Sequence, residues 1–379
     1  MPGVSEPEQR LAFRTEAFDE FYDILEELGS GQFAVVRRVL EKGSGLEYAG
    51  KFIRKRRFAS SRRGVRRSDI EREVEVLREV GGHQNVISLK DVFETPTTVI
   101  LVLQLVSGGE LFEHVCRKER LVEREAAAFL RQILLGVSHL HSRHIVHLDL
   151  KPENVMLSSR WSTKVKLIDF GLSRRIPPGS QVKDMIGTPE FVAPEIVAYD
   201  CLSPATDMWA VGVITYILLS GSSPFLGACR EETFCNISSV NYSFEADNFH
   251  NVSECAKDFI RSLFIRDQKK RAKVEDCLRH PFILSGAEEP STGEVERAAE
   301  KELNLASIRA FAMRRRWKQA ISAVMVCNRL VRRAKEQVGQ DSTANRRSQY
   351  QPAAVHISLF ALCLTSPPDL SVNPLAEEA

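Results

Sequence analysis

The sequence lacks the features that mark a secreted or membrane-inserted protein. Its eight cysteines form no Cys-x-x-Cys pair, so we expect reduced thiols in a cytoplasmic protein rather than a disulfide framework. The opening residues, MPGVSEPEQR, contain no apolar signal core. The longest late apolar run, VHISLFALCL at 355–364, is about half as long as the ~20 residues that a membrane span needs. We therefore expect no signal peptide and no membrane anchor.

A strong excess of one charge is also missing. The net charge is +2 at pH 7, with 43% hydrophobic and 27% charged residues, as in an ordinary soluble protein. This balance predicts no nucleic-acid partner for the chain as a whole, although local basic clusters could still bind a polyanion. The 379 residues are enough for a full-sized core and suggest two or three domains.

The pattern of the chain changes once, near residues 103–109. Before this break, strand-like runs surround one helical stretch, SDIEREVEVLREV at 68–80, for which Ser68 or Asp69 is a plausible N-cap. After it, helical patterns dominate to about residue 284. The sequence therefore predicts an α+β fold with a small β-rich lobe, a hinge and a larger helical lobe.

The glycine-rich stretch LGSGQFAVV at 28–36 lies between two strand-like runs. Gly29 and Gly31 would let the backbone approach phosphate oxygens that a Cβ atom would block. Ala34 occupies the position of a usual third glycine, so the stretch departs from the strict pattern. A tight hairpin without a ligand explains it about as well.

Two charged residues further along would complete a phosphate site. Lys51 ends the strand-like run EYAGK, where its ammonium would reach the α- and β-phosphates. Glu73 lies on the helical stretch that follows, on the side that could pair with Lys51. Taken singly, each is more simply a solvated surface charge.

The stretch VHLDLKPEN at 146–154 is more specific. Asp149 can accept the proton of a substrate hydroxyl, and Lys151 can neutralise a transferring phosphoryl group. Asn154 supplies a hard oxygen for magnesium. These residue types at this spacing are typical of the catalytic loop of a phosphotransferase.

Two later motifs follow in the expected order. LIDFG at 167–171 would deliver Asp169 to the metal from a buried strand, and GTPEFVAPE at 187–195 would close an activation segment. Because chance seldom produces all of these motifs in order, the chain resembles a eukaryotic protein kinase over roughly 22–282.

The resemblance implies a two-lobed kinase fold with ATP and Mg²⁺ as cofactors. It also implies that Asp207 braces the catalytic loop, that Arg271 pairs with Glu195, and that four side chains form an apolar spine between the lobes: Leu77, Leu89, His147 and Phe170. A packed core explains these residues equally well. The residues expected to contact the nucleotide are Leu28, Gly29, Ser30, Gly31, Gln32, Phe33, Ala34, Val35, Val36, Ala49, Lys51, Gln104, Val106, Glu110 and Met156.

A basic stretch narrows the resemblance. RKRRFASSRRGVRR at 54–67 is inserted between the Lys51 strand and the Glu73 helix. It could be a solvated loop, a nuclear-import signal or a polyanion patch. At this position it resembles the basic loop of the death-associated protein kinase family, as do GSGQFAVV, SGGELFE, GTPEFVAPEIV and SGSSPFLG. The family resemblance implies dimerisation through this loop. The sequence after the kinase region shows no ankyrin repeats, and in this respect it resembles the shorter members of the family.

Leu148 stands where many catalytic loops carry arginine. In such kinases the arginine binds a phosphate on the activation segment. Leu148 carries no charge, yet the residues expected to perform phosphoryl transfer are present. We therefore expect an active kinase whose switch is not phosphorylation of the activation segment.

A basic amphipathic segment at 308–335 is the candidate switch. Trp317, Ile321, Val324 and Leu330 fall on one side of a helix with basic residues at both ends, as in a calmodulin target. A membrane-surface helix or a helix docked permanently on the kinase remains an alternative. The family resemblance implies an autoinhibitory, calmodulin-binding role. At the family's autophosphorylated serine this chain has Ala320, so we expect that brake to be missing.

The sequence therefore predicts a calcium/calmodulin-regulated serine/threonine kinase. Glu110 and Glu153, near the cleft edge, would attract arginines before the phosphorylated residue. The family implies myosin-light-chain-like substrates and a role in cell death or autophagy. A pseudokinase scaffold and a calmodulin-binding adaptor remain alternatives. We expect a loosely ordered leader at 1–20, a kinase domain at 21–284 (lobes at about 21–103 and 109–284), a linker at 285–307, the regulatory helix at 308–335 and a disordered tail at 336–379.

Overall fold

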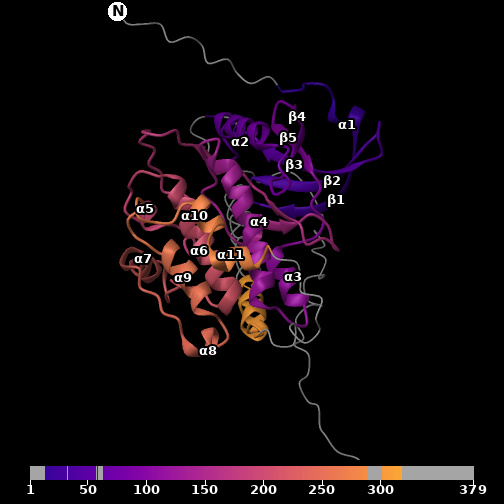
Figure 1. Cartoon of the computed structure of the whole chain (residues 1–379). Coiled ribbons are helices and arrows are strands. Elements are labelled where there is room, and N and C mark those ends of the chain that lie inside the picture. Colours follow the sequence, from indigo (N-terminus) through magenta and orange to yellow (C-terminus); the bar gives the residue numbers. More distant parts are fainter. Residues whose placement is uncertain (1–12, 32, 57, 59–62, 288–300, 318–379) are drawn as a thin grey trace, which may run out of the picture. The chain divides into compact units, whose positions relative to one another are not determined.

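The computed structural model describes residues 13–31, 33–56, 58, 63–287 and 301–317 (Figure 1). Several predictions concern residues outside these ranges. They are the nucleotide contact of Gln32, the calmodulin contacts of Ile321, Val324 and Leu330, the missing brake at Ala320, and the tail. Among the described residues, the predicted α+β architecture with two lobes is confirmed.

The small lobe is built on a five-stranded antiparallel sheet with strand order β1-β2-β3-β5-β4. Val36 of β2 pairs with Lys51 of β3, which pairs with Leu101 of β5, so these three side chains share one face of the sheet. The elements are α1 (Phe18–Phe21), β1 (Tyr22–Ser30), β2 (Ala34–Glu41), β3 (Glu47–Arg54), α2 (Arg67–Val80), β4 (Leu89–Glu94) and β5 (Thr98–Gln104).

Helix α2 buries the side of the predicted helical stretch that carries Ile70, Val74, Leu77 and Val80. Glu73 is buried with them, because it lies one turn from Ile70 and Leu77. The helix begins earlier than the sequence predicted. Its N-cap is Arg66 rather than Ser68 or Asp69, since Asp69 lies in the first turn, where its carboxylate favours the positive end of the helix dipole.

The ordered part of the small lobe also begins earlier than predicted. Residues 13–20 were expected to belong to a loose leader, but Phe13 and Phe18 are buried. Arg14 makes two backbone hydrogen bonds with β4: its N–H donates to Val92 over 3.0 Å, and its carbonyl accepts from Glu94 over 2.7 Å. Aromatic contacts and strand-like pairing therefore fix this segment, and neither has a local signal in the sequence.

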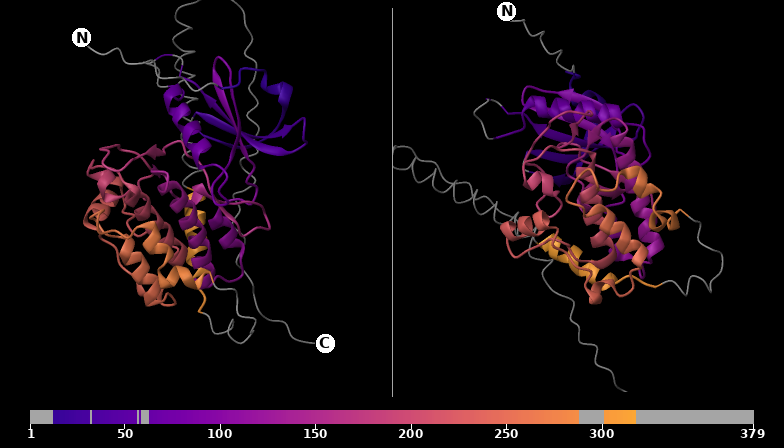
Figure 2. Two further views of the ribbon diagram at one scale, coloured as in Figure 1. Left: turned by 45° about the horizontal axis from the view of Figure 1, so that its top comes forward. Right: turned by 60° about the vertical axis from the view of Figure 1, so that its left-hand side comes forward.

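The large lobe is mainly helical and lies below the sheet in the left view of Figure 2. Its central helix, α6, is buried on all sides, which explains why its sequence has no polar face. The elements are α3 (Leu111–Arg117), α4 (Glu123–His141), β6 (Ile145–Val146), the 3₁₀ turn η1 (Pro152–Asn154), β7 (Val155–Leu157), β8 (Val165–Leu167), β9 (Arg174–Arg175), α5 (Pro194–Val197), α6 (Pro204–Ser220), α7 (Arg230–Ser239), α8 (Ala246–Phe249), α9 (Glu254–Leu263), α10 (Val274–Leu278) and α11 (Pro281–Ser285).

A further helix at 305–317 packs against the large lobe (Figures 1 and 2). Leu305, Ile308 and Phe311 are its buried residues. The guanidinium of Arg309 donates to the carbonyl of Cys116 over 3.0 Å and to that of Lys118 over 2.7 Å. The helix thus begins inside the segment predicted as a linker, because its first apolar residues contact the lobe.

The fit of this helix depends on one glycine. Gly221, just after α6, has φ +70°, and a Cβ atom there would lie 2.2 Å from the carbonyl carbon of Ser307. Any other residue would push the helix away. No helix in the part of the chain that the structure describes is long and apolar enough to cross a bilayer.

Candidate active site

Lys51 lies between two carboxylates that come from different lobes. Its ammonium nitrogen is 2.7 Å from Glu73 Oε1 and 3.0 Å from Asp169 Oδ1. Lys51 is the largest influence that lowers the pKa of Asp169, to about 2, and burial opposes it. Burial acts to lower the pKa of Lys51, but Glu73 and Asp169 together raise it. Lys51 and Asp169 are therefore charged at neutral pH, and the ion pair between Lys51 and Glu73 holds α2 close to the catalytic loop.

Strand alternation decides which residues of the glycine-rich hairpin face Lys51. Val36 shares the face of Lys51, and Ala49, two residues before Lys51 on β3, shares it too. Val35 pairs with Phe52, so its side chain lies on the opposite face of the sheet. There it lines a separate surface hollow of about 380 Å³ together with Phe33.

The side chains of Val35 and Phe33 therefore lie away from the face that carries Lys51, and the predicted contact of these two residues with the nucleotide stays a prediction. A glycine-rich hairpin shows no clear alternation of polar and apolar residues. The sequence therefore did not show which side chains lie on which face of the sheet there. The other predicted nucleotide contacts include the last residue of β5, Gln104, and the segment that follows it. In that segment Val106 packs against the main core, and Glu110 forms a β-bridge with Met156.

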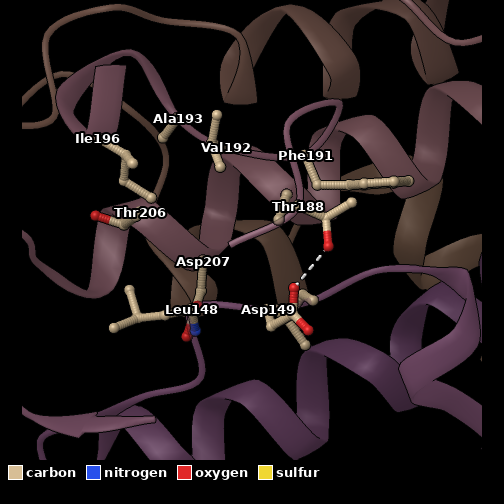
Figure 3. Close-up of a pocket in the computed structure, with 11 residues that line it drawn as sticks. Leu148, Asp149, Thr188, Phe191, Val192, Ala193, Ile196, Thr206 and Asp207 are labelled. Atoms are coloured by element: carbon tan, nitrogen blue, oxygen red, sulfur yellow. Dashed lines mark hydrogen bonds between the residues drawn. The ribbon is translucent and has the colours of Figure 1, made fainter. Parts of the chain in front are cut away.

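The catalytic loop holds Asp149 in a small network. Lys151 Nζ donates to Asp149 Oδ2 over 2.6 Å, and the hydroxyl of Thr188 donates to Asp149 Oδ1 over 2.9 Å (Figure 3). Lys151 also donates to Thr188 over 3.1 Å, and the Asn154 amide donates to the Asp149 carbonyl over 2.8 Å. The sequence did not predict the contact between Thr188 and Asp149, although Thr188 lies in the GTPEFVAPE motif.

Residues predicted to support this loop lie where the resemblance placed them. Asp207 accepts hydrogen bonds from the backbone N–H groups of His147 (2.8 Å) and Leu148 (2.9 Å). The rings of His147 and Phe170 lie 4.9 Å apart, and Leu77 is buried in the main core. The buried Arg271 makes two hydrogen bonds with Glu195, of 2.9 and 3.0 Å.

The residues present suit a divalent metal ion bound with a nucleotide. The Asn154 NH₂ group is committed to Asp149, which leaves its Oδ1 atom as a hard ligand. The side chain of Asp169 is 48% exposed although its carboxylate bonds to Lys51, so it remains accessible to a cation. Two protein oxygens are what Mg²⁺ usually takes when phosphates and water supply its remaining ligands.

Leu148 replaces a charge with apolar packing. It has φ +66° and is buried, and it lines a small pocket with Phe191, Val192 and Ile196 (Figure 3). The segment after Thr188 thus rests on hydrocarbon at the place where a phosphate-binding arginine would carry charge.

We expect the protein to stay fully active after phosphatase treatment. Ser173 is 1% exposed, and its hydroxyl donates to the His147 carbonyl over 3.2 Å, so it is a poor phosphate acceptor. The hydroxyl of Thr188 is committed to Asp149. Ser180 is partly exposed, but position 148 carries no arginine that could bind a phosphate on it. Initial rates before and after treatment, with phosphate loss checked by mass spectrometry, test this. A large fall that rephosphorylation reverses would contradict it.

Comparisons with known proteins agree with this geometry. The protein kinase domain family matches residues 22–283. The death-associated protein kinase dapk-1 of Caenorhabditis elegans is 59% identical over 314 residues, which make up 83% of this chain and 22% of that protein. Death-associated protein kinase 2 of Homo sapiens is 52% identical over 322 residues, 84% of this chain and 86% of the relative. The solved twitchin kinase region of C. elegans has a TM-score of 0.72 at 35% identity, over 83% of this chain and 52% of that one.

These matches confirm the kinase fold that the order of motifs predicted. Kinases of this fold use ATP and a divalent metal ion, and the arrangement of Lys51, Asn154 and Asp169 is consistent with that use. The chain therefore belongs to the death-associated protein kinase family of serine/threonine protein kinases.

Proposed function

We propose that the chain transfers the γ-phosphoryl group of Mg²⁺-ATP to serine or threonine residues preceded by arginine, and that calcium-loaded calmodulin relieves its autoinhibition. The observation that carries this proposal is the position of Arg315. This residue belongs to the helix at 305–317, yet its guanidinium forms an ion pair with Glu153, next to the catalytic loop.

The surroundings of Arg315 are those of a specific arginine site. The side chains of Arg315 and Glu153 are 17% and 23% exposed, and Arg315 lies 5.6 Å from the ring centroid of Phe191. Burial lowers the pKa of Arg315 to about 10, while the charges of Glu110 and Asp149 act to raise it. Arg315 is thus charged at neutral pH and within the electrostatic field of the catalytic carboxylate.

Glu110 and Glu153 are the two residues that the sequence predicted to attract substrate arginines. Burial is the main cause that raises the pKa of Glu110, with repulsion from Glu113 adding to it and Arg315 opposing. A buried carboxylate with a raised pKa gains from a guanidinium partner. We infer that substrates present an arginine to this acidic site, and that Arg315 occupies it in the resting enzyme.

A second ion pair supports the same position of the helix. Arg316, the next residue, pairs with Glu113 of α3. Two neighbouring arginines therefore meet two carboxylates from different elements. The helix competes with a basic substrate for the same charges, which is the behaviour expected of an autoinhibitory segment.

The other side of this helix is available to a partner. Met313 and Trp317 are 71% and 61% exposed, which is unusual for large apolar side chains. A Met-rich groove that opens with calcium, as in calmodulin, suits such a side chain, and acidic groups at its rim suit the arginines. Calmodulin that takes up Trp317 would withdraw Arg315 from Glu153, so the two binding events exclude each other.

The proposed transfer uses the site described above. Asp149 accepts the proton of the substrate hydroxyl while Lys151, 2.6 Å from that carboxylate, neutralises the phosphoryl group. Lys51, fixed by Glu73, would hold the α- and β-phosphates, and Asn154 and Asp169 would hold the metal. Bound Mg²⁺ supplies neutralisation of the phosphate charges.

We expect Trp317→Ala to weaken binding of calcium-loaded calmodulin by about 2 kcal/mol, as for a buried aromatic anchor. The measurement is calorimetric titration of the full chain, combined with phosphorylation of an arginine-containing peptide with and without calcium and calmodulin. Trp161→Ala is the matched control, because Trp161 is 89% exposed on the large lobe.

Equal affinities for the Trp317 and Trp161 variants would contradict the calmodulin proposal. Failure of the unmodified protein to phosphorylate the peptide under any condition would favour the pseudokinase scaffold instead. Calmodulin-dependent function that survives removal of both lobes would favour the adaptor.

Several finer predictions remain part of the proposal. The names of the relatives support a role in cell death. Myosin-light-chain-like substrates, a role in autophagy, dimerisation through 54–67 and a cytoplasmic location rest on the family resemblance. In the described part of that basic stretch, Lys55 and Arg67 pair with Glu94 over 2.7 and 2.9 Å, so these two cations already have intramolecular partners.

A further inference from the structure

Five charged side chains join α2 to the activation segment. We call them the five-charge cluster: Arg66, Asp69, Arg72, Arg174 and Asp184. Within it, Asp69 accepts from Arg66 Nε over 2.8 Å and from Arg72 Nη2 over 2.9 Å. Arg174, on β9, donates from Nη2 to Asp184 Oδ2 over 2.9 Å.

The two halves of the five-charge cluster act on each other through their fields. Burial and repulsion from Arg72 lower the pKa of Arg174, while Asp184 and Asp69 act to raise it. Hydrogen bonding to Asp69 is the main cause that raises the pKa of Arg66, and the charge of Asp184 adds to it. Three cations therefore surround Asp69 and Asp184, and without Asp184 the positive charges would outnumber the carboxylates three to one.

We propose that Asp184 is a positioning residue for phosphoryl transfer, whose fixed carboxylate holds the activation segment to β9 and α2 as a phosphate group does in kinases that require phosphorylation there. Phosphorylation orders such a segment by adding an anion between arginines. In this chain the anion is the carboxylate of Asp184, which is always present. The inference rests on the kinase activity proposed above, which the rate of the unmodified protein establishes separately in the same assay.

In kinases that bind an activation-segment phosphate, the cation is an arginine in the catalytic loop, and this chain has Leu148 at that position. Leu148 is 5% exposed and lines the same small pocket as Phe191 and Val192, and its apolar side chain contributes no cation near the catalytic loop. Arg174 instead supplies the charge. Its Nη1 atom donates to the carbonyls of Leu172 (2.8 Å) and Ser173 (3.1 Å), which orients the guanidinium and leaves Nη2 for Asp184.

The residues just before Asp184, Val182 and Lys183, are also held in place by contacts that need no phosphate. The Leu202 N–H donates to the Val182 carbonyl over 2.8 Å. The ammonium of Lys183 lies 5.9 Å from the ring centroid of Tyr199. The segment therefore has a backbone bond, a cation–π contact and an ion pair on three successive residues, and only the ion pair reaches β9 and the field of α2.

The connection to catalysis runs through α2. Arg72 precedes Glu73 in the chain, and Asp69 lies one turn before it, so the five-charge cluster lies at the end of α2 that places Glu73 against Lys51. If the carboxylate of Asp184 is lost, repulsion between Arg72 and Arg174 is no longer balanced. We expect α2 and the activation segment to move apart in a larger fraction of the molecules, which lowers kcat.

The test compares Asp184→Asn with Asp184→Glu in the full chain, activated with calcium and calmodulin. Asp184→Asn keeps the shape of the side chain and removes its charge, and we expect kcat to fall by about threefold to tenfold, in the range of a partly exposed ion pair within a network. Asp184→Glu should restore most of the rate. Asp200→Asn is the matched control and should leave the rate unchanged, because Asp200 is an exposed carboxylate just beyond the activation segment, after α5.

Two further measurements separate positioning from a general loss of structure. Hydrogen–deuterium exchange should speed up at 176–190 and at the start of α2 in Asp184→Asn, while the thermal unfolding temperature changes little. Adding Asp184→Asn to Arg174→Gln should cause no additional loss, because the ion pair is already broken. An Asp184→Asn enzyme with kcat within twofold of the unmodified protein, or one that Asp184→Glu does not rescue, would overturn the proposal.

Discussion

Asp149→Ala is expected to lower phosphoryl transfer by about 10²–10⁴ while the protein remains folded. The factor is that of a positioned general base, because no other carboxylate in the described catalytic loop lies beside both Lys151 and Thr188. The measurement is the single-turnover rate with an arginine-containing peptide. Binding of Mg²⁺-ATP should persist, since Lys51, Asn154 and Asp169 are unchanged.

Asp149→Asn is the companion variant. It keeps the shape of the side chain and an acceptor oxygen for the Thr188 hydroxyl, but it cannot take up the substrate proton. We expect it to be nearly as slow as Asp149→Ala. Near-normal turnover in either variant, with an unchanged thermal unfolding temperature, would contradict the assignment of Asp149 as the base.

Truncation after Ala312 is expected to raise activity in calcium-free buffer by at least about tenfold and to make it insensitive to calmodulin. This cut removes Arg315, Arg316 and Trp317 and keeps the helix residues that are buried in the large lobe. A cut before residue 303 would instead expose the surface that Leu305, Ile308 and Phe311 cover, and would confuse loss of inhibition with loss of stability.

Single substitutions refine the same test. Arg315→Ala should reproduce most of the activation, since it alone vacates the ion pair with Glu153. Arg314→Ala is the matched control, because Arg314 is its exposed neighbour on the helix and should leave basal activity unchanged. If the truncated enzyme and Arg315→Ala were no faster than the unmodified protein without calcium, the helix would be a docked element and not an inhibitor.

The positions of the candidate catalytic residues were predictable because each of their motifs is contiguous. Asp149, Lys151 and Asn154 lie within six consecutive residues, so their spacing in the sequence largely sets their relative positions. Lys51 and Glu73 come from different elements. The alternation of side chains along the Lys51 strand and the helical period of the Glu73 helix nevertheless indicated the sides on which the two residues meet. The fold class followed in the same way, from the single change in hydrophobic period between the lobes.

Where the sequence has no hydrophobic periodicity, it predicted the local structure less well. In the glycine-rich hairpin, for example, the sequence did not show on which face of the sheet the Val35 side chain lies; the sheet register places it opposite the face that carries Lys51. Residues 13–20 and 301–307 have too few apolar residues to show a pattern. They are ordered because Phe13, Phe18 and Leu305 are buried by parts of the chain that are distant in sequence.

The sequence by itself determined that this chain is a kinase, which residues form its candidate catalytic site, and that Leu148 carries no charge for an activation-segment phosphate. Only the tertiary structure decided which charged groups pair beside the activation segment and which arginine pairs with Glu153. Asp184 meets Arg174, and Arg315 meets Glu153, through the tertiary folding of the chain, which no periodicity in the sequence encodes. Such pairs become specific when folding buries opposite charges together, since the cost of an unpaired buried charge exceeds any local preference of the chain.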